Sequence, residues 1–360
     1  MEYHIFPEEK LRTFTESVFK SIGCSDEHAA LAADVLIKAD LRGIDSHGVA
    51  RLTGYVRLWE KKRINSTPNI KIVHETATTA TVDGDAGLGL VVAPWAMKVA
   101  IEKAEKYGSG WVAVKNSNHF GIAGYHALMA VEQDMIGYAV TNASPLVTPT
   151  FSTERMLGTN PICYAFPAKK YPPFIVDMAT STAANGKLEI AQRKGEEIPL
   201  GWVQTKDGIT TTDSHALKSG GSLLPLGSDR EHGSHKGFGL SATVDILSAV
   251  LSGASYGPWA PPFVAFMDPL PDQPGEGLGH FLGAMRVDGF RPKDDFKAHM
   301  DNWIERFKSA KPIDENQKVI IPGEPELEAE KERKINGIPL IDAVVNDLNE
   351  VAGKFGLERL

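Results

Sequence analysis

Three features are scarce in this sequence, and each scarcity excludes a class of protein. The 360 residues include two cysteines, Cys24 and Cys163, which lie far apart and in no CxxC pair. Neither a disulfide framework nor a structural zinc site is therefore expected. No apolar run reaches the ~20 residues that span a bilayer. Basic residues are outnumbered, with 38 Lys and Arg against 46 Asp and Glu, which gives a net charge of −8. Nucleic acid and anionic membranes are therefore not expected as partners.

The N-terminus also lacks a secretory signal. The opening MEYHIFPEE is acidic and polar, without the basic start and apolar run of a signal peptide. Apolar residues make up 42% of the chain and charged residues 23%, which is close to the globular average. These properties predict a folded cytoplasmic enzyme rather than a fibre or a disordered chain.

Motifs of several enzyme classes are missing as well. The sequence has no HExxH, no P-loop and no Gly-x-Ser-x-Gly elbow. Gly237-x-Gly239-x-x-Ala242 mimics a dinucleotide fingerprint, but a polar loop precedes it where the fingerprint requires a strand. His232 and His235 are spaced for a metal ion, but no third ligand is evident. We expect no metal site.

The ends of the chain are predicted to be helical and the centre mixed α/β. Segments typical of strands are 70–73, 80–82, 111–114, 136–140, 162–166, 174–176, 264–267 and 281–287. Segments with helical spacing are 8–19, 25–39, 91–107, 183–193, 237–251, 296–307, 324–334 and 340–355. We predict a discontinuous helical domain of residues 1–68 with 295–360, and an α/β domain of residues 69–294.

The segment 45–51 contains a first candidate for chemistry. His47 and Arg51 are four residues apart, where a further helix reaching Lys62 is expected to begin, so their side chains would share one face. Histidine exchanges protons near neutral pH, and arginine binds a carboxylate through two parallel hydrogen bonds. A base beside such a clamp suits oxidation of a 2-hydroxy acid, and Ser46 could orient the imidazole. A capped helix start with a surface arginine is the structural alternative.

Further segments place polar or small residues where a ligand can approach the backbone. The loop 116–124 follows a strand and precedes a helix, whose free N–H groups make an anion site. The turns 158–161 and 176–181 suit a nucleotide, and Lys187 follows on a predicted helix. His235 and Lys236 begin another helix and could contact phosphate. Each also has an ordinary explanation as a capped loop, a tight turn or a solvated charge.

Taken together, seven segments resemble the malate/L-lactate dehydrogenase family. This family also contains ureidoglycolate dehydrogenase, diketogulonate reductase, sulfolactate dehydrogenase and piperideine-carboxylate reductase. The matching segments are LRGIDSHG (41–48), NHFG (118–121), GTNP (158–161), VDMATS (176–181), LPLG (224–227), HKGFGL (235–240) and IPGE (321–324). Each is weak alone, but together they follow the family's order across almost the whole chain.

The resemblance implies an α/β (α+β) fold whose NAD(P)-binding domain is not a Rossmann fold and has a largely antiparallel sheet. It implies an oxidoreductase that transfers a hydride between nicotinamide and a small 2-hydroxy or 2-oxo acid. Malate/oxaloacetate or lactate/pyruvate is the expected pair. Family members are typically homodimers with cofactor sites near the interface, so we expect a homodimer. Between NAD and NADP we favour NAD.

The resemblance also assigns roles to individual residues. His47 looks like the proton donor or acceptor, with Ser46 beside it, but in the ureidoglycolate branch this role falls on the histidine that matches His119. Arg51 and Thr159 look like substrate contacts. The residues that look like cofactor contacts are His119, Phe120, Gly121, Ile122, Ala123, Asp177, Met178, Ala179, His235, Lys236, Gly323 and Glu324.

Lys187 departs from one branch of the family. The imine-reducing enzymes resemble a pattern with an aspartate there that joins their catalytic relay. A lysine fits the hydroxy-acid enzymes, in which a cation could hold a carboxylate, so Lys187 is included among the catalytic candidates. Ureidoglycolate dehydrogenase and diketogulonate, sulfolactate or cyclic imine reductases stay open as alternatives. A nucleotide-binding module without catalysis is the non-enzymatic alternative.

Overall fold

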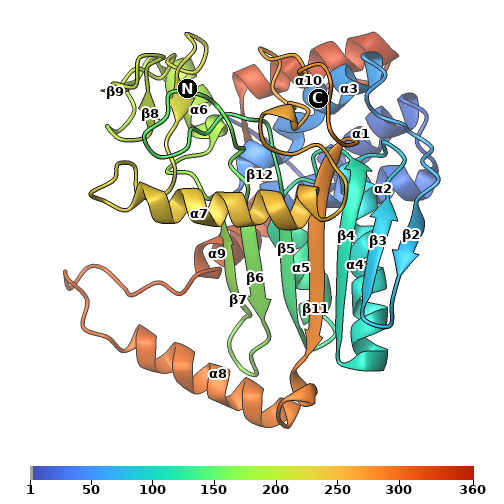
Figure 1. Cartoon of the computed structure of the whole chain (residues 1–360), viewed down its shortest axis with the longest axis vertical. Helices are drawn as coiled ribbons and strands as arrows, with labels where there is room; N and C mark the ends of the chain where they lie inside the picture. Colours follow the sequence, from blue (N-terminus) through green and yellow to red (C-terminus); the bar gives the residue numbers. More distant parts are fainter. Residues whose placement is uncertain (1–2) are drawn as a thin grey trace.

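A computed structural model describes residues 3–360, in which helices cover both faces of a large sheet (Figure 1). The first half contains β1 (Tyr3–Phe6), α1 (Glu8–Ser21), α2 (Asp26–Leu41), α3 (Leu52–Glu60), β2 (Lys71–Glu75), β3 (Thr79–Asp83), α4 (Gly89–Tyr107), β4 (Ser109–Ser117), α5 (Ala123–Val131), β5 (Met135–Thr141), β6 (Ile162–Phe166) and β7 (Phe174–Met178). The second half contains α6 (Asn185–Lys194), β8 (Val203–Gln204), β9 (Thr210–Thr211), β10 (Ser222–Leu223), α7 (Ser234–Asp245), β11 (Leu278–Arg286), α8 (Lys293–Lys308), α9 (Glu324–Asn336), β12 (Ile338–Ile341) and α10 (Asp342–Phe355). Within this described part of the chain, no helix combines the length and apolarity needed to cross a membrane.

The central sheet has seven strands in the order β2-β3-β4-β11-β5-β6-β7. Within it, β3 and β4 pair in parallel and the other neighbouring pairs are antiparallel. β11 comes from late in the sequence and inserts between β4 and β5, where Phe281 is opposite Ala113 on one side and Val140 on the other. This arrangement confirms the predicted fold class with its largely antiparallel sheet, and it differs from the parallel sheet of a Rossmann fold.

Small residues let helices pack closely on one face of this sheet. α4 and α5 lie behind the sheet in Figure 1, and their alanines share a core with β3, β4, β5 and β11. At Gly137 of β5, an added Cβ would lie 2.0 Å from the carbonyl oxygen of Ala127 on α5. A side chain there would push the helix away. α7 crosses the opposite face, and its last turns continue as a π-helix over Ile246–Val250.

The two ends of the chain meet in one apolar core. β1 pairs with β12 in antiparallel register, and α1, α2, α3 and α10 pack around it. Large, fully buried members of this core are Leu11, Phe19, Leu36 and Tyr55. Because Tyr55 comes from α3, which directly follows Arg51, this core also supports the end of the segment that carries His47 and Arg51.

The helix α8 lies apart from this core, at the foot of the sheet in Figure 1. Its Trp303 packs on Phe174 of β7 with ring centroids 5.4 Å apart, and Lys297 pairs with Asp134 at 2.6 Å. These contacts join α8 to the sheet, whereas α9 packs on α2. The division into residues 1–68 with 295–360 and residues 69–294 stays a prediction.

A smaller core joins α6 to the short strands that follow it. Leu188 of α6 packs with Val203 of β8 and Leu223 of β10, and β8 pairs with both β9 and β10. This core holds α6 against the short strands. The space between α6 and α3 is where the candidate site lies.

Three predicted elements differ in the structure. Residues 264–267 form no strand, because the flanking prolines at 261, 262, 269 and 271 cannot donate hydrogen bonds to a ladder. The helix expected to begin at 45–51 starts only at Leu52, because the backbone turns at Gly48 (φ −88°, ψ −146°) between two 3-10 turns, Asp45–His47 and Val49–Arg51. The helix predicted over 340–355 begins at Asp342, because the residues before it pair with β1.

Candidate active site

A sharp turn between α2 and α3 carries three of the predicted site residues. Val49 donates its backbone N–H to Oδ2 of Asp40 on α2 at 2.8 Å. An added Cβ at Gly48 would lie 1.8 Å from the other oxygen of the same carboxyl group. Asp40 is fully buried. Its carboxyl group holds the turn by accepting the Val49 N–H, and it leaves no room for a side chain at position 48.

This turn brings Ser46, His47 and Arg51 together, although not on one helical face. His47 and Arg51 end successive 3-10 turns before α3 begins. Arg51 Nε donates to the Ser46 carbonyl oxygen at 2.5 Å, and Ser46 Oγ lies 2.8 Å from His47 Nδ1. The group therefore forms through a folded loop rather than through helical spacing, which corrects the geometry expected from the sequence.

His119 lies beside His47 and comes from the loop after β4. The two imidazole rings stack with centroids 5.6 Å apart and an interplanar angle of 22°. The Tyr55 hydroxyl lies 2.7 Å from His119 Nδ1, and the Gly121 N–H donates to the same nitrogen at 3.3 Å. Phe263 packs on the His119 ring at 4.7 Å between centroids. Groups from four separate segments thus hold this imidazole in place.

Both imidazoles are kept neutral near physiological pH. Burial, followed by the charge of Arg51, lowers the pKa of His47 to about 3. Burial also lowers the pKa of His119 well below its usual value, with His47 and Arg51 as smaller causes. Burial raises the pKa of Tyr55, so its hydroxyl keeps the proton. A neutral imidazole can accept a proton from a substrate hydroxyl or donate a hydrogen bond to a carbonyl.

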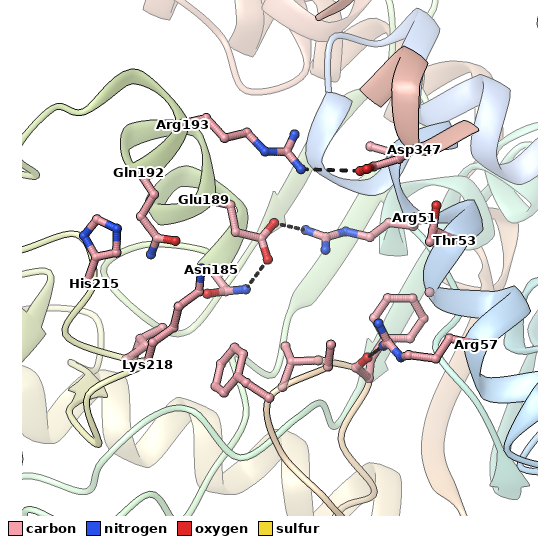
Figure 2. A pocket seen from close by; sticks show the side chains of 17 residues that line it. Arg51, Thr53, Arg57, Asn185, Glu189, Gln192, Arg193, His215, Lys218 and Asp347 are labelled. Atoms are coloured by element: carbon pink, nitrogen blue, oxygen red, sulfur yellow. Dashed lines mark hydrogen bonds and ion pairs between the residues drawn. The ribbon is translucent and has the colours of Figure 1, made fainter. Parts of the chain in front are cut away.

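A cavity of about 570 Å³ opens beside Arg51, between α3 and α6 (Figure 2). Glu189 of α6 lies 3.5 Å from Arg51 Nη2, and the Asn185 amide donates to the other oxygen of Glu189 at 2.8 Å. One turn further along α6, Arg193 pairs with Asp347 of α10 at 3.7 Å. The remaining titratable side chains on the wall are Arg57, His215 and Lys218. Cations outnumber carboxylates around this cavity, which suits an acidic ligand.

Lys187 does not join this group. It is exposed on α6, and its ammonium nitrogen lies 5.6 Å from the ring centroid of Trp202. Residues two apart on a helix point in roughly opposite directions, and on α6 it is Glu189 that faces Arg51. The structure therefore places a carboxylate beside the arginine, where the sequence suggested a cation.

The predicted cofactor contacts around α5 meet at the end of β7. Residues 120–122 form the loop into α5, and Ala123 is the first residue of the helix. Asp177 of β7 accepts the Gly124 N–H at 2.7 Å, which places its carboxylate at the positive end of the helix. Gly323, just before α9, lies against β7, where an added Cβ would be 3.1 Å from the Ile175 side chain. These three segments border one region, as a shared ligand site requires.

Thr159 lies beside the same end of β7. Its carbonyl oxygen accepts the Thr180 N–H at 2.9 Å, and the residues just before Thr180 are the predicted contacts Met178 and Ala179. Leu226 donates its N–H to the Thr180 carbonyl oxygen, also at 2.9 Å. Thr159, Met178 and Ala179 therefore border one junction of loops.

The other predicted cofactor contacts are less enclosed. His235 and Lys236 are exposed on the first turn of α7. The Glu324 carboxylate is engaged near its own helix, where it accepts the Ile321 N–H at 3.0 Å and pairs with Lys308. This contact ties the loop before α9 to the first residue of the helix. Across residues 3–360, no group of three or more His, Cys, Asp or Glu side chains is placed to hold a metal ion.

Sequence reasoning missed several residues of this site. Tyr55 carries a usable signal, because it lies four residues after Arg51, the residue directly before α3, and so close to it at the start of the helix. Glu189 is two residues from Lys187, but no pattern shows which of the two faces inward. Phe263 comes from an irregular, proline-flanked segment, and no periodicity could place its ring against a histidine.

Known proteins resemble this chain over almost its whole length. The sequence profile of the malate/L-lactate dehydrogenase family matches residues 6–349. Malate dehydrogenase from Pyrococcus abyssi is 45% identical over 359 residues, covering 99% of this chain and 97% of that protein. L-sulfolactate dehydrogenase from Methanocaldococcus jannaschii is 39% identical over 341 residues, covering 94% of each. The structure of malate dehydrogenase from Pyrococcus horikoshii OT3 matches with a TM-score of 0.90 and 40% identity, over 99% of this chain and 97% of that one. The chain therefore belongs to the malate/L-lactate dehydrogenase family, whose hydroxy-acid dehydrogenases work with a nicotinamide cofactor.

Proposed function

We propose that the protein transfers a hydride reversibly between NAD(H) and a 2-hydroxy/2-oxo acid, with malate and oxaloacetate as the pair. The observation that carries this proposal is the stacked pair His47 and His119, which is linked through Ser46 to Arg51, the member of the group that lines a cavity rich in cations. Arginine binds a carboxylate through two parallel hydrogen bonds, which would leave the adjacent hydroxyl-bearing carbon near the imidazoles. Malate dehydrogenases are among the relatives with more than 40% identity, which supports malate over lactate.

The residues around α5 and β7 fit a nicotinamide dinucleotide. The start of α5 lies beside the end of β7, where the Gly124 N–H meets Asp177, and a helix start attracts phosphate. The exposed Asp177 carboxylate can accept hydrogen bonds from ribose hydroxyls, as acids often do in NAD-binding proteins, which supports NAD over NADP. His235 and Lys236 are cationic candidates for phosphate contacts. When bound, the nicotinamide ring supplies or accepts the hydride.

Hydrogen bonding supports different roles for the two histidines. The Gly121 N–H donates to Nδ1 of His119, so Nε2 carries the proton in the neutral ring. His119 therefore suits hydrogen-bond donation to a substrate oxygen. The Ser46 hydroxyl can accept a hydrogen bond from Nδ1 of His47, which leaves Nε2 free to take the substrate's hydroxyl proton. We assign proton transfer to His47 and carboxylate binding to Arg51, with Thr159 as a further substrate contact.

The experiment that tests this proposal follows the absorbance of reduced nicotinamide with a panel of substrates. Oxaloacetate, pyruvate, sulfopyruvate, diketogulonate, ureidoglycolate and a cyclic imine are tried with each cofactor. We expect the highest kcat/KM with oxaloacetate and NADH. A preference for NADPH by an order of magnitude would overturn the cofactor assignment. A clearly higher kcat/KM with another substrate would assign the protein to the branch of the family that uses that substrate. No turnover with any of them would favour a nucleotide-binding module.

Sulfolactate is the second candidate substrate. A sulfonate in place of the distal carboxylate keeps two acid groups on the molecule, and one relative with 39% identity is an L-sulfolactate dehydrogenase. The cation-rich cavity accommodates either acid group equally well on charge grounds. The comparison of oxaloacetate with sulfopyruvate in the panel decides between them.

We also propose a cytoplasmic homodimer. Both cysteines are unpaired thiols, which fits a reducing compartment. Aromatic side chains are exposed on β6 and on α8, where Tyr164, Trp303 and Phe307 are 42%, 39% and 48% exposed. Apolar patches of this kind mark protein interaction surfaces. Sedimentation equilibrium should give twice the 39.1 kDa of the chain, and a monomer at micromolar concentration would contradict the proposal.

A further inference from the structure

We infer that Arg57 binds the second acid group of the substrate and thereby selects diacids over lactate-type monoacids. This inference rests on the proposed function and names the residue that sets its substrate class. Arg51, directly before α3, and Arg57 on α3 face one cavity (Figure 2), and Gly54 between them also lines it. These positions are three residues apart and so follow one stripe of the helix. The Phe263 ring packs against Gly54, where an added Cβ would lie 2.4 Å from the ring, so this ring forms the cavity wall beside the two arginines.

The charges around the cavity leave Arg57 without a partner. Arg51 faces Glu189 at 3.5 Å and Arg193 faces Asp347 at 3.7 Å. Within residues 3–360, Arg57 forms no ion pair, and its guanidinium donates instead to the carbonyl oxygen of a loop residue. It is partly buried, and burial followed by the charge of Arg51 lowers its pKa. A partly buried cation next to a second cation favours an anion between them.

The positions of the two arginines suit the two ends of a short diacid. Arg51 adjoins His47, so it is the clamp for the carboxylate next to the reacting carbon. Arg57 is six residues further along, roughly 9 Å by the rise of a helix, and its guanidinium lies at the Phe263 side of the cavity. A distal carboxylate or sulfonate would pair with Arg57. A methyl group in its place would leave the cation unpaired, and sites built to bind a polar group reject analogues that lack it.

The test compares kcat/KM for oxaloacetate and pyruvate in the wild type and in Arg57 variants. Arg57→Gln should lower kcat/KM for oxaloacetate about 10- to 100-fold, the usual range for loss of a charge-assisted hydrogen bond. The value for pyruvate should change far less. Arg57→Lys should fall in between, because lysine keeps the charge but loses the planar two-bond geometry. Arg63→Gln is the matched control, since Arg63 also donates to this loop, at Pro262, but lies outside the cavity. It should keep the wild-type ratio.

Two results would overturn the inference. Equal losses with both substrates in Arg57→Gln would show that the arginine only holds the loop at Phe263. A wild-type enzyme that uses both acids equally would show that no second acid group is recognised. Thermal stabilisation by malate and by lactate, measured in the same variants without turnover, separates this inference from the proposed function. Malate should raise the Tm of the wild type and not that of Arg57→Gln, and the absence of this difference counts against Arg57 even if no turnover is found.

Discussion

A single buried carboxyl group, that of Asp40, supports the turn on which the proposed chemistry depends. One of its oxygens accepts the Val49 N–H, and the other has no hydrogen-bond partner among residues 3–360. Burial raises the pKa of Asp40 well above its usual value, so a neutral carboxyl is favoured at a place where a charge would be costly. Residues that meet no substrate thus determine where His47 and Arg51 lie.

Replacing each histidine separately tests the division of labour between them. His47→Ala should slow the chemical step by about 10²- to 10⁴-fold, the usual contribution of a general acid or base, with cofactor affinity little changed. His119→Ala should weaken both turnover and cofactor binding, because it lies in the loop that enters α5. Single-turnover rates and cofactor titration measure the two effects. Full turnover in His47→Ala, together with loss of turnover at unchanged cofactor affinity in His119→Ala, would reverse the assignment.

For individual residues, the sequence predicted which residues meet at the site better than it predicted the geometry of their contacts. The spacing of His47 and Arg51 indicated that they act together, and the structure places them together by a different backbone path. The choice between Lys187 and Glu189 depends on the rotation of α6 about its axis. That rotation is set by the apolar packing of Leu188 on β8 and β10, which no local pattern specifies.

At the scale of elements, the close approach of α6 to the turn is the contact that completes the site. An added Cβ at Gly186 would lie 2.7 Å from the Ser46 Cβ and 3.2 Å from Arg51 Nη2. Gly186→Ala should therefore displace α6 or Arg51 and lower kcat/KM, although alanine favours a helix by up to about 1 kcal/mol over glycine. Steady-state kinetics alongside denaturant unfolding measure both effects.

Gly353 of α10 provides the matched control for this substitution. It is also a helical glycine, and no atom lies within 4 Å of an added Cβ. Gly353→Ala should gain helix stability and keep wild-type kinetics. If Gly186→Ala also keeps wild-type kinetics, α6 does not need to sit against Arg51 during turnover.

Long periodic elements were predictable from sequence, and short ones were not. α4, α5 and the strands of the sheet centre were found near their predicted positions because their apolar patterns are strong. β1 and β12 are four residues each, and they exist because residues at opposite ends of the chain pair. The segment 264–267 has the composition of a strand, but it pairs with no neighbouring strand in the structure.

For the whole molecule, the order of strands is the feature that the sequence could not provide. β11 separates β4 from β5 although it follows them by more than 130 residues, and local patterns carry no information on such pairing. The resemblance to a family was what predicted a largely antiparallel sheet. The burial that this sheet creates has a consequence for stability in acid.

Two buried histidines flank Phe120, the neighbour of His119, under the site. His126 Nε2 lies 2.9 Å from the Phe120 carbonyl oxygen, and the His280 ring stacks on Phe120 at 4.8 Å between centroids. His280 also bonds to the hydroxyl of Thr141 at 2.7 Å. Burial lowers the pKa of His126 to about 4 and that of His280 to about 3. Their usual value in an unfolded chain is about 6.5.

The contribution of these two histidines to the free energy of unfolding should therefore be fully retained above pH 6.5 and fall as the pH is lowered from 6.5 toward 4. In that window the unfolded chain binds protons that the buried imidazoles do not, so acid favours unfolding. Each histidine accounts for about 2 kcal/mol at pH 5 on this basis. Denaturant unfolding at pH 7, 6 and 5 measures the slope. His126→Gln removes one titrating group and keeps a donor for the Phe120 carbonyl, so its stability should depend less steeply on pH than that of the wild type. A variant with an unchanged slope would show that His126 is protonated in the folded protein as readily as in the unfolded chain.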